Sequence, residues 1–365
     1  MSYLVMDGRS RTLWSAFFAL VLVMVQECHP AFALEMTPDL RQIVDGARIE
    51  GKLIVESPPG LMGGGDAVKE AAAWIKQQFG LTLTTAYTPN PNNRGQAGKL
   101  YTEFQAHVPA STDAYLGAAV PIEAELTSGL FRSVQWTNLM PGRITPEIAE
   151  ADGRALRILT RFPGILYNRQ VVPQMSAVQS MSDLLKPTYK GAFATNPDLG
   201  GLDGYVAQIG YDKAVEYFTA FANQITGIVP CGSQERIASG EVAALVFDCA
   251  STAQTQDRFK NILDLRIVSD AALRRYQYLA IPANARDPNA GILFGLYLSS
   301  SEGQAANRDR RHDGDLDAYP DSVPSGALAK AEKEGVKFTD IDIGWASTHR
   351  NMASQIETLS KIISR

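Results

Sequence analysis

Residue types that commonly catalyse reactions or bind metal ions are scarce in this sequence. Its 365 residues include 3 cysteines and 4 histidines, and His107, His312 and His349 stand in unrelated contexts. Neither a G-x-S-x-G nucleophile elbow nor an H-E-x-x-H metalloprotease motif occurs. We therefore expect no catalytic residue, no metal held by protein ligands and no cofactor, and we expect that the protein is not an enzyme.

Positive charge is also limited. Lys and Arg number 34 against 39 Asp and Glu, which gives a formal net charge of -5. A short basic run of Arg308, Arg310 and Arg311 is interrupted by Asp309. Because nucleic-acid binding requires clustered basic side chains that neutralise phosphates, we expect no nucleic-acid partner. The hydrophobic share of 45% is that of a globular chain that can bury sizeable cores.

The N-terminus has the pattern of a secretory signal peptide. Two arginines precede an apolar run over residues 13–25, and a small-residue A-x-A motif ends at Ala33. A membrane anchor is the alternative, but the run is shorter than the roughly 20 residues needed to span a bilayer. We predict that residues 1–33 are a signal peptide cleaved after Ala33 and that the mature protein is periplasmic.

Export changes the interpretation of the cysteines. After cleavage only Cys231 and Cys249 remain. An even pair in an oxidising compartment favours a disulfide bond, which would stabilise the fold by about 3 kcal/mol through restriction of the unfolded chain. Two buried free thiols are the alternative.

Downstream of residue 33, apolar residues alternate between strand and helix spacing. A capping box of Ser180 and Asp183 begins one helix, and Asp287 with Pro288 begins another. Strand, helix and strand in this order predict parallel strands joined by right-handed crossovers. Residues 307–335 are the least periodic, and we expect them to be irregular. We expect strands at residues 53–55, 81–87, 112–117, 191–195 and 242–247, and helices at 66–79, 95–107, 213–223 and 352–363.

Parallel α/β sheets bind ligands at the carboxyl ends of their strands, where loops and helix N-termini meet. The glycine-rich turn at residues 63–65 could accept a phosphate or carboxylate, or could simply connect a strand to a helix. Acidic side chains in the later loops would favour a cationic or hydroxyl-rich ligand. We expect ligand contacts from Ser57, Gly63, Gly64, Tyr115, Asn196, Asp198, Asp203, Tyr205, Ser233 and Asp248.

Asp313, Asp315 and Asp317 alternate like the start of a calcium-binding loop. The glycine required at the sixth position is Ala318, and the acid required at the twelfth is Pro324. We therefore expect a solvated acidic loop without calcium.

Several stretches resemble the extracellular solute-binding family 1 of ABC transporters, which includes ferric-ion, thiamine, polyamine and phosphonate binders. They follow the family's order from about residue 50 to 305 and include residues 112–115 (TDAY), 164–169 (GILYNR), 180–191 (SMSDLLKPTYKG), 237–242 (IASGEV), 288–290 (PNA) and 298–304 (LSSSEGQ). The stretch at residues 164–169 resembles the family's crossover strand.

This resemblance implies a two-lobed type II periplasmic binding protein fold. Each lobe is a mostly parallel sheet flanked by helices, and two crossover strands form the hinge. The implied lobes are residues 34–160 plus 275–365, and residues 161–274. The implied function is that of a monomeric periplasmic receptor that captures a small molecule or ion between its lobes and docks on an ABC permease at the inner membrane.

The family resemblance leaves the ligand and the role open. Ferric-ion members of the family hold iron with adjacent tyrosines after the strand that here ends at Phe247, where this chain has Asp248, Cys249, Ala250 and Ser251. A ferric-iron or metal-complex ligand would need a substitute such as Tyr205. An exported enzyme on the same scaffold is a second possibility, and a receptor that feeds signalling instead of transport is a third.

Overall fold

The N-terminal part of the described chain follows the expected order of strands and helices. The computed structural model describes residues 34–58, 61–90, 92–196, 201–230, 233–247 and 258–364. Met1–Leu34 and Glu35–Arg365 are separate units, and every element below belongs to the second. The first elements are α1 (Pro38–Glu50), β1 (Lys52–Ser57), α2 (Gly65–Phe79), β2 (Thr84–Pro89) and α3 (Asn93–Gln105).

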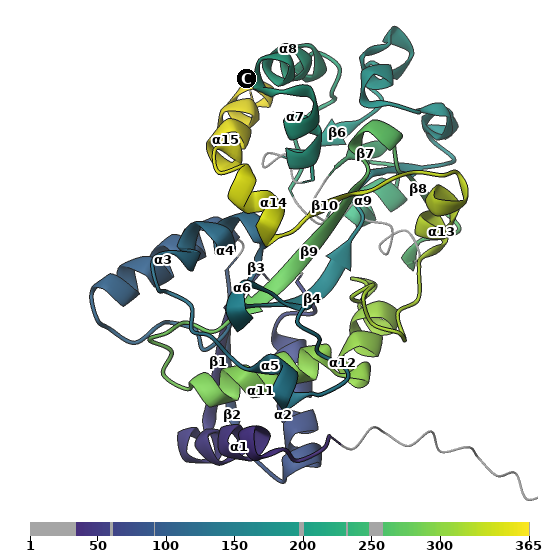
Figure 1. Ribbon diagram of the computed structural model, residues 1–365. Helices are drawn as coiled ribbons and strands as arrows, with labels where there is room; N and C mark the ends of the chain where they lie inside the picture. The colour runs from purple at the N-terminus through teal and green to yellow at the C-terminus, as the bar shows by residue number, and fades with distance from the viewer. Residues whose placement is uncertain are drawn as a thin grey trace, which may run out of the picture. The chain divides into compact units, whose positions relative to one another are not determined.

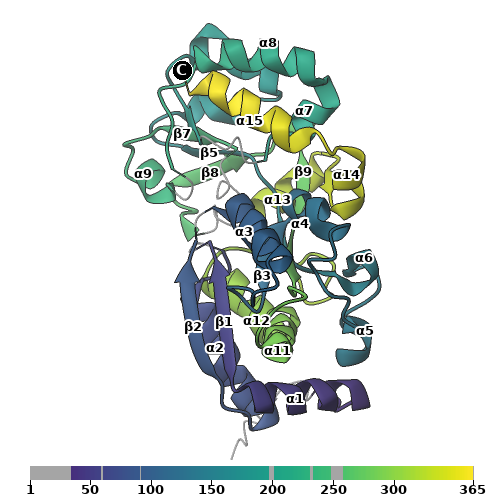
Figure 2. The ribbon, with the colours of Figure 1, turned by 90° about the vertical axis from the view of Figure 1, so that its left-hand side faces the viewer.

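Strands β1 and β2 form a parallel pair that runs from Lys52 opposite Thr84 to Ser57 opposite Pro89 (Figure 2). The intervening helix α2 ends at Gly80 in the left-handed conformation, as expected. Its start differs from the expectation, because Gly64 occupies the N-cap and Asp66 lies in the first turn. There the Asp66 carboxylate faces the positive end of the helix dipole instead of capping a backbone N–H.

The β9 sheet is built around the longest strand of the described chain. It contains β3 (Tyr115–Ala118), β4 (Ala155–Arg161), β9 (Leu273–Ala280) and β10 (Thr339–Ile341). β3 and β4 pair with β9 in the antiparallel sense, and β10 pairs with it in parallel (Figure 1). A bridge between Val55 and Ala114 connects β1 to the start of β3. All of β4 except Arg161 is buried, including the polar residues Arg157 and Thr160.

The β5 sheet has the strand order β6 (Ala194–Thr195), β7 (Ala244–Val246), β5 (Ile165–Asn168) and β8 (Leu263–Arg266). β6 and β7 are parallel, and β5 is antiparallel to both of its neighbours. Successive residues of β5 point to opposite faces, so Ile165 and Tyr167 belong to one hydrophobic cluster and Leu166 to another. The stretch that resembles a crossover strand, residues 164–169, is therefore a central strand of this sheet, and β4 before it is the strand that pairs with β9.

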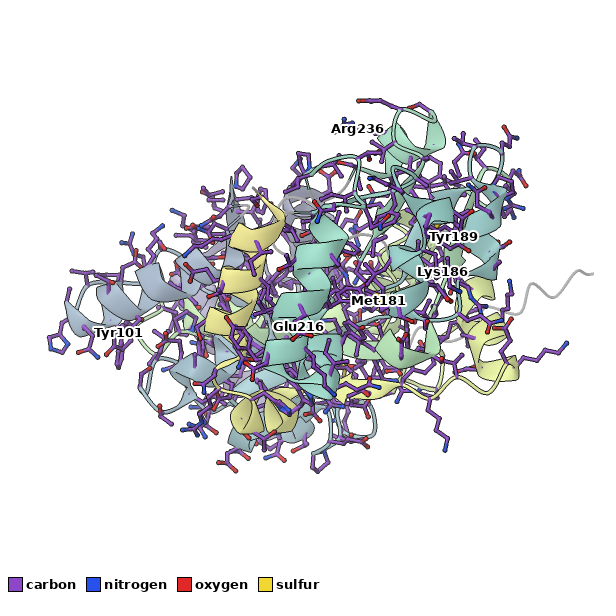
Figure 3. The ribbon with its side chains drawn as sticks, turned by 90° about the horizontal axis from the view of Figure 1, so that it is seen from above. Tyr101, Met181, Lys186, Tyr189, Glu216 and Arg236 are labelled. Carbon is purple, nitrogen blue, oxygen red and sulfur yellow. The ribbon has the colours of Figure 1, made fainter. Side chains whose placement is uncertain are left out.

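Helices cover both faces of the β5 sheet. The cluster around Ile165 and Tyr167 includes residues of α7 (Asp203–Ile209), α8 (Tyr211–Ala222) and α15 (Met352–Ile363), and the cluster around Leu166 includes residues of α9 (Gln234–Ala238) and α13 (Gly326–Lys333). The 3-10 turns with Met181, Lys186 and Tyr189 lie beside α8, where Glu216 is labelled (Figure 3). Tyr217 of α8 donates a hydrogen bond to the carbonyl of Met181 at 2.8 Å.

The C-terminal helix packs differently from the predicted lobe assignment. Met352, Ile356, Leu359 and Ile363 form its buried face, as their spacing predicts. They join the core of the β5 sheet, and α15 lies against α8 in both views (Figures 1 and 2). α14 (Ile343–Thr348) instead packs against α4 (Ala119–Leu126). The assignment of all residues from 275 to 365 to the lobe that contains β1 therefore does not match the packing of α13 and α15.

The remaining elements include several local features that the sequence predicts. The capping box of Ser180 and Asp183 is present, and Pro288 begins α11 with Asp287 at the N-cap. Residues 307–335 contain α13, so they are less irregular than expected. No helix in the described ranges is both long and apolar enough to span a bilayer. The elements not yet named are α5 (Trp136–Leu139), α6 (Glu150–Gly153), α11 (Pro288–Ser299), α12 (Ser301–Ala305), η1 (Pro173–Ala177), η2 (Met181–Leu185), η3 (Pro187–Tyr189), η4 (Ser269–Ala271) and the π-helical turn η5 (Ala306–Arg310).

Candidate functional site

Ser57 lies at the carboxyl end of β1, one of the positions where a parallel sheet binds ligands. Its backbone carbonyl accepts hydrogen bonds from the Tyr87 hydroxyl at 3.1 Å and from the Asn90 N–H at 2.9 Å. Its own hydroxyl is buried and has no hydrogen-bond partner among the described residues. The Tyr87 ring also lies against Gly65, where a Cβ atom would come within 2.9 Å of the ring. Ser57 and the start of α2 are therefore neighbours.

The glycine turn before α2 requires glycine for two reasons. Gly63 and Gly64 have φ values of +82° and +52°, which L side chains rarely adopt. A Cβ atom on Gly63 would lie 2.2 Å from the Nε atom of Arg311, so the turn and this side chain are in close contact. Backbone bonds from Gly64 N to Leu61 O and from Asp66 N to Gly63 O hold the turn. The N–H of Asp66 is therefore already used within the turn. A helix N-terminus nevertheless favours an acceptor or an anion through its remaining N–H groups and its dipole.

Glu56, which sequence reasoning missed, is a buried acid next to Ser57 at the end of β1. Its carboxylate accepts hydrogen bonds from the side chains of Asn90 at 2.6 Å and Lys99 at 2.9 Å. Although burial raises the pKa of Glu56, the bonds from Lys99 and Asn90 outweigh it and lower that pKa overall. Gln96 donates to the Glu56 carbonyl at 2.6 Å, and its side-chain oxygen is buried without a partner. The only sequence signal that could have identified Glu56 was its position as an acidic residue directly after the apolar stretch at residues 53–55.

A second group of predicted residues lies at the carboxyl ends of β6 and β7. The Asn196 side-chain amide donates to the carbonyl of Phe247 at 2.9 Å, and both residues directly follow their strands. Ser233 occupies the N-cap of α9, but its hydroxyl donates to the carbonyl of Pro230 at 2.6 Å. Asp198, Cys231, Asp248 and Cys249 lie outside the described residues, as do residues 1–33, where a signal peptide is predicted, so their predicted roles stay predictions.

Asp203 and Tyr205 belong to α7 and have partners inside the protein. The Asp203 carboxylate forms an ion pair with Arg275 of β9 at 2.8 Å. The Tyr205 ring packs edge-on against Tyr217, with 5.3 Å between ring centroids, in the core of the β5 sheet. Burial, with a smaller contribution from Asp270, raises the pKa of Tyr205 to about 12. This environment disfavours the phenolate form that a hard ferric ion prefers.

Tyr115 lies in the core of the β9 sheet. Its side chain is fully buried and stacks on Phe131 with 5.7 Å between ring centroids. Its ring also lies over Gly117, where a Cβ atom would come within 2.5 Å. In this structure Tyr115 supports the sheet, and a ligand contact from it remains a prediction.

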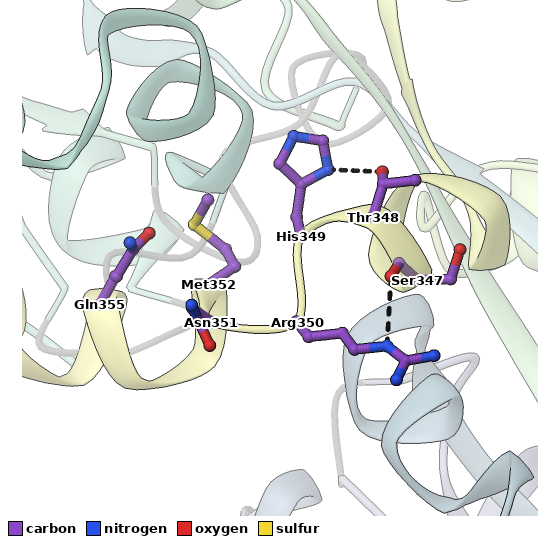
Figure 4. A pocket seen from close by; sticks show the side chains of 7 residues that line it. All are labelled: Ser347, Thr348, His349, Arg350, Asn351, Met352 and Gln355. Atoms are coloured by element: carbon purple, nitrogen blue, oxygen red, sulfur yellow. Dashed lines mark hydrogen bonds between the residues drawn. The ribbon is translucent and has the colours of Figure 1, made fainter.

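An open pocket of about 330 Å³ lies elsewhere, at the joint between α14 and α15 (Figure 4). In it, His349 hydrogen-bonds the Thr348 hydroxyl at 3.0 Å, and Arg350 donates to the carbonyl of Ser347. None of the ligand contacts predicted from the sequence lines it. Among the described residues, no three His, Cys, Asp or Glu side chains are grouped in a way that could hold a metal ion.

Comparison with known proteins relates this chain to others through structure alone. No protein-family model matches the sequence, and no curated protein sequence is significantly similar. The periplasmic binding protein AfuA from Actinobacillus pleuropneumoniae, solved with fructose-6-phosphate, is 16% identical with a TM-score of 0.64, covering 86% of this chain and 96% of AfuA. Iron-bound HitA from Pseudomonas aeruginosa is 16% identical with a TM-score of 0.65, covering 86% and 99%.

A third similar structure is the spermidine/putrescine substrate-binding protein PotD from Streptococcus pneumoniae. It is 16% identical with a TM-score of 0.58, and the match covers 85% of this chain and 99% of PotD. These proteins are described as binding a sugar phosphate, iron and polyamines, so the shared feature is their architecture. The two-lobed architecture implied by the sequence resemblance is confirmed, and this chain has the type II fold of the periplasmic binding proteins of ABC transporters. The expectation that each sheet is mostly parallel is wrong for the described strands, because three of their pairings are parallel and four are antiparallel.

Proposed function

We propose that this protein is a periplasmic receptor of an ABC importer, which captures a small solute between its two lobes and closes over it. The observation that supports this most directly is the pairing of β4 with β9. The chain leaves the β9 sheet through β4, and β5 begins shortly after Arg161, at Ile165. It returns from β8 to β9, so the two connections between the sheets lie side by side. Paired connections of this kind allow the sheets to rotate as rigid bodies.

We place the ligand contacts at the carboxyl ends of the strands. On one side the proposed contacts are Ser57, Gly63, Gly64 and the start of α2. On the other they are Asn196 and Ser233, together with Asp198 and Asp248. The neighbouring acids Glu56 and Asp203 are already paired with Lys99 and Arg275. This pairing favours a ligand bound by hydrogen bonds to hydroxyl, amide and backbone groups, with an anionic group at the N-terminus of α2.

The remaining parts of the proposal follow from the same architecture. The mature protein would begin after Ala33, fold as a monomer in the periplasm and dock in its closed form on an inner-membrane permease. Residues 34–160 and 161–274 would belong to different lobes, with β4 and β9 between them. The packing of α13 and α15 on the β5 sheet supports assigning these two helices to the second lobe.

The first experiment is native mass spectrometry of protein purified from the periplasm without refolding, followed by small-angle scattering with the solute it retains. We expect a bound small molecule, and a smaller radius of gyration with it than without it. A radius that stays constant at saturating solute would contradict the proposal, because ligand must favour the closed state.

A variant pair tests the placement of the site. Ser57→Ala removes a hydroxyl that has no partner in the structure, so we expect stability to be unchanged and affinity for the retained solute to fall about fivefold to tenfold. Ser354→Ala is the matched control, because Ser354 is exposed on α15 and its hydroxyl donates to the nearby carbonyl of Asn351. Equal affinities of the two variants would argue against the proposed site.

A ferric-iron or metal-complex ligand is the second candidate, supported by the iron-bound structure of HitA. Tyr205 is the substitute ligand expected from the sequence, and its burial against Tyr217 opposes that role. We expect no visible phenolate-to-iron charge-transfer band when ferric citrate is added. A band that Tyr205→Phe abolishes would establish the iron alternative.

The proposed absence of enzymatic activity agrees with the binding proteins that share the fold. An exported enzyme on the same scaffold would convert the retained solute, and Asp203→Asn or Asp248→Asn would abolish the conversion. Incubation of the purified protein with that solute should instead return it unchanged.

A further inference from the structure

The alternating aspartates at residues 313, 315 and 317 do not form the solvated loop that the sequence suggested. The side chains of Asp313, Asp315 and Asp317 are 14%, 6% and 25% exposed. Asp313 and Asp317 both bind strand β4, through Arg161 and Thr160, which lie 152 and 157 residues away in the sequence. Asp313 also binds Met62, 251 residues away, and no local pattern reveals these contacts.

Asp313 contacts the glycine turn and strand β4 at the same time. Its Oδ2 atom accepts a hydrogen bond from the backbone N–H of Met62 at 2.7 Å. Its Oδ1 atom accepts one from the guanidinium of Arg161, the last residue of β4. The side chains of Arg161 and Asp313 are 15% and 14% exposed, so water screens their attraction little.

Asp317 fixes the same segment to both connecting strands. Its carboxylate accepts a hydrogen bond from the Thr160 hydroxyl on β4 at 2.6 Å and pairs with Arg274 on β9 at 3.0 Å. The carbonyl of Asp315 accepts a bond from the Thr160 N–H at 3.0 Å. Residues 313–317 are therefore bonded to both β4 and β9.

Asp313, the first residue of the segment 313–317, binds the start of the glycine turn, where the backbone conformation is uncommon. Met62 has a φ of +51°, which is unfavourable for a non-glycine residue. Arg311 packs against Gly63 and pairs with Glu70 of α2. A strained backbone persists only where its surroundings hold it, and here the Asp313 carboxylate binds the N–H of the strained residue.

We propose that Asp313 is a positioning residue. It couples the conformation of residues 61–64, which lead into the glycine turn and include its first two glycines, to the connecting strand β4. Opening or closing of the β4–β9 connection then changes the geometry that the turn offers to a ligand, and ligand at the turn biases the connection in return. The inference rests on the proposed function for its biological role. The coupling itself is a property of the free protein.

Amide hydrogen exchange, measured by mass spectrometry on the full mature chain without ligand, tests the coupling. Arg161→Gln removes the contact on β4 and leaves every residue of the turn intact. We expect exchange in the peptide covering residues 61–68 to become about tenfold faster, because Asp313 then holds the Met62 N–H less firmly. Unchanged exchange in that peptide, with faster exchange confined to residues 155–161, would overturn the proposal.

Two further variants separate coupling from a general loss of stability. Asp309→Asn makes the same charge change as Asp313→Asn and lies on the same stretch of chain, but Asp309 is exposed and pairs with its neighbour Arg308, so residues 61–68 should exchange as in the wild type. Asp313→Asn keeps an acceptor for the Met62 N–H while removing the charge that faces Arg161. We expect it to match Arg161→Gln, and the double variant to add nothing to either single change. Additive effects in the double variant would contradict the coupling.

The outcome does not depend on the proposed function. If the scattering experiment shows no closure but Arg161→Gln accelerates exchange at the turn, the receptor proposal fails and the coupling stands. If closure occurs and Arg161→Gln does not change amide exchange in residues 61–68, the coupling fails and the receptor proposal stands.

Discussion

Arg275 of β9 and Asp203 at the first position of α7 form an ion pair, with 2.8 Å between Nη2 and Oδ2. The two side chains are 20% and 9% exposed. Asp203 also accepts a hydrogen bond from the N–H of Gly204 through its other oxygen. The pair connects the β9 sheet to a helix that covers the β5 sheet. The Asp203 carboxylate, which the sequence predicted as a ligand contact, therefore already has Arg275 as its partner.

Removing one partner of this pair leaves a charge with little access to water. We expect Asp203→Asn to lower the free energy of unfolding by about 3 kcal/mol, because breaking a mostly buried pair leaves the remaining ion uncompensated. Urea unfolding at pH 7 measures this. Glu357→Gln is the control, since its pair with Lys361 is well exposed and should be worth less than about 0.5 kcal/mol. Equal losses for both variants would show that Asp203 and Arg275 do not interact as the structure indicates.

Asp113 makes stability depend on pH. Its carboxylate accepts bonds from the N–H groups of Ile54 and Asp287, and burial, reinforced by Asp287 and Glu50, raises its pKa to about 6. Because the folded chain then holds this proton more tightly than the unfolded chain, stability falls as pH rises from about 4 to about 6 and is level above that. The fall attributable to this group is on the order of 3 kcal/mol.

The comparison with Asp113→Asn checks this pH dependence. Urea unfolding between pH 4 and 7 should show the decline in the wild type and a flatter profile in the variant, which has no group to titrate there. Asp183 acts in a separate window, because hydrogen bonds led by that from Lys186 lower its pKa to about 2, so its contribution disappears only below about pH 4. Identical slopes between pH 4 and 6 in both proteins would refute the assignment to Asp113.

The glycine turn should tolerate substitution less well than an open turn. Gly63 and Gly142 both have positive φ, at +82° and +77°, so alanine at either position costs about 1 kcal/mol in backbone conformation. At Gly63 the new Cβ must also displace Arg311, whereas nothing lies within 4 Å of one on Gly142. We expect Gly63→Ala to lose about 2 kcal/mol or more in thermal unfolding and Gly142→Ala about half of that. The reverse order would mean that Arg311 does not pack against the turn.

Much of the fold follows from local patterns. Apolar spacing predicts the buried face of α15, and a single Ser–x–x–Asp sequence predicts the capping box at Ser180. The end of α2 at Gly80 is equally local. These features depend on residues within a few positions of each other, so one sequence is sufficient to find them.

The site is harder to predict because its contacts join distant segments. Tyr205 looked like a ligand contact from its position in a loop rich in Asp and Gly, yet it lies in the first turn of α7, and its ring packs on Tyr217. Asp313 looked solvated, and its partner Met62 is 251 residues away. Residue type and spacing set which chemistry is available, but tertiary packing decides which groups are already used by the protein itself.

The predicted disulfide between Cys231 and Cys249 provides the last test, because both residues lie outside the described part of the chain. Each follows a described segment: Pro230 directly precedes Cys231, and Phe247, which directly follows β7, lies two residues before Cys249. Asn196 contacts the carbonyl of Phe247, and Ser233 contacts that of Pro230, so a bond between the cysteines would tie together the backbone that holds both proposed ligand contacts. We expect no free thiol when the mature protein is unfolded without reductant, and a loss of about 3 kcal/mol in the Cys231→Ser and Cys249→Ser double variant. Two reactive thiols in the non-reduced protein would exclude the bond.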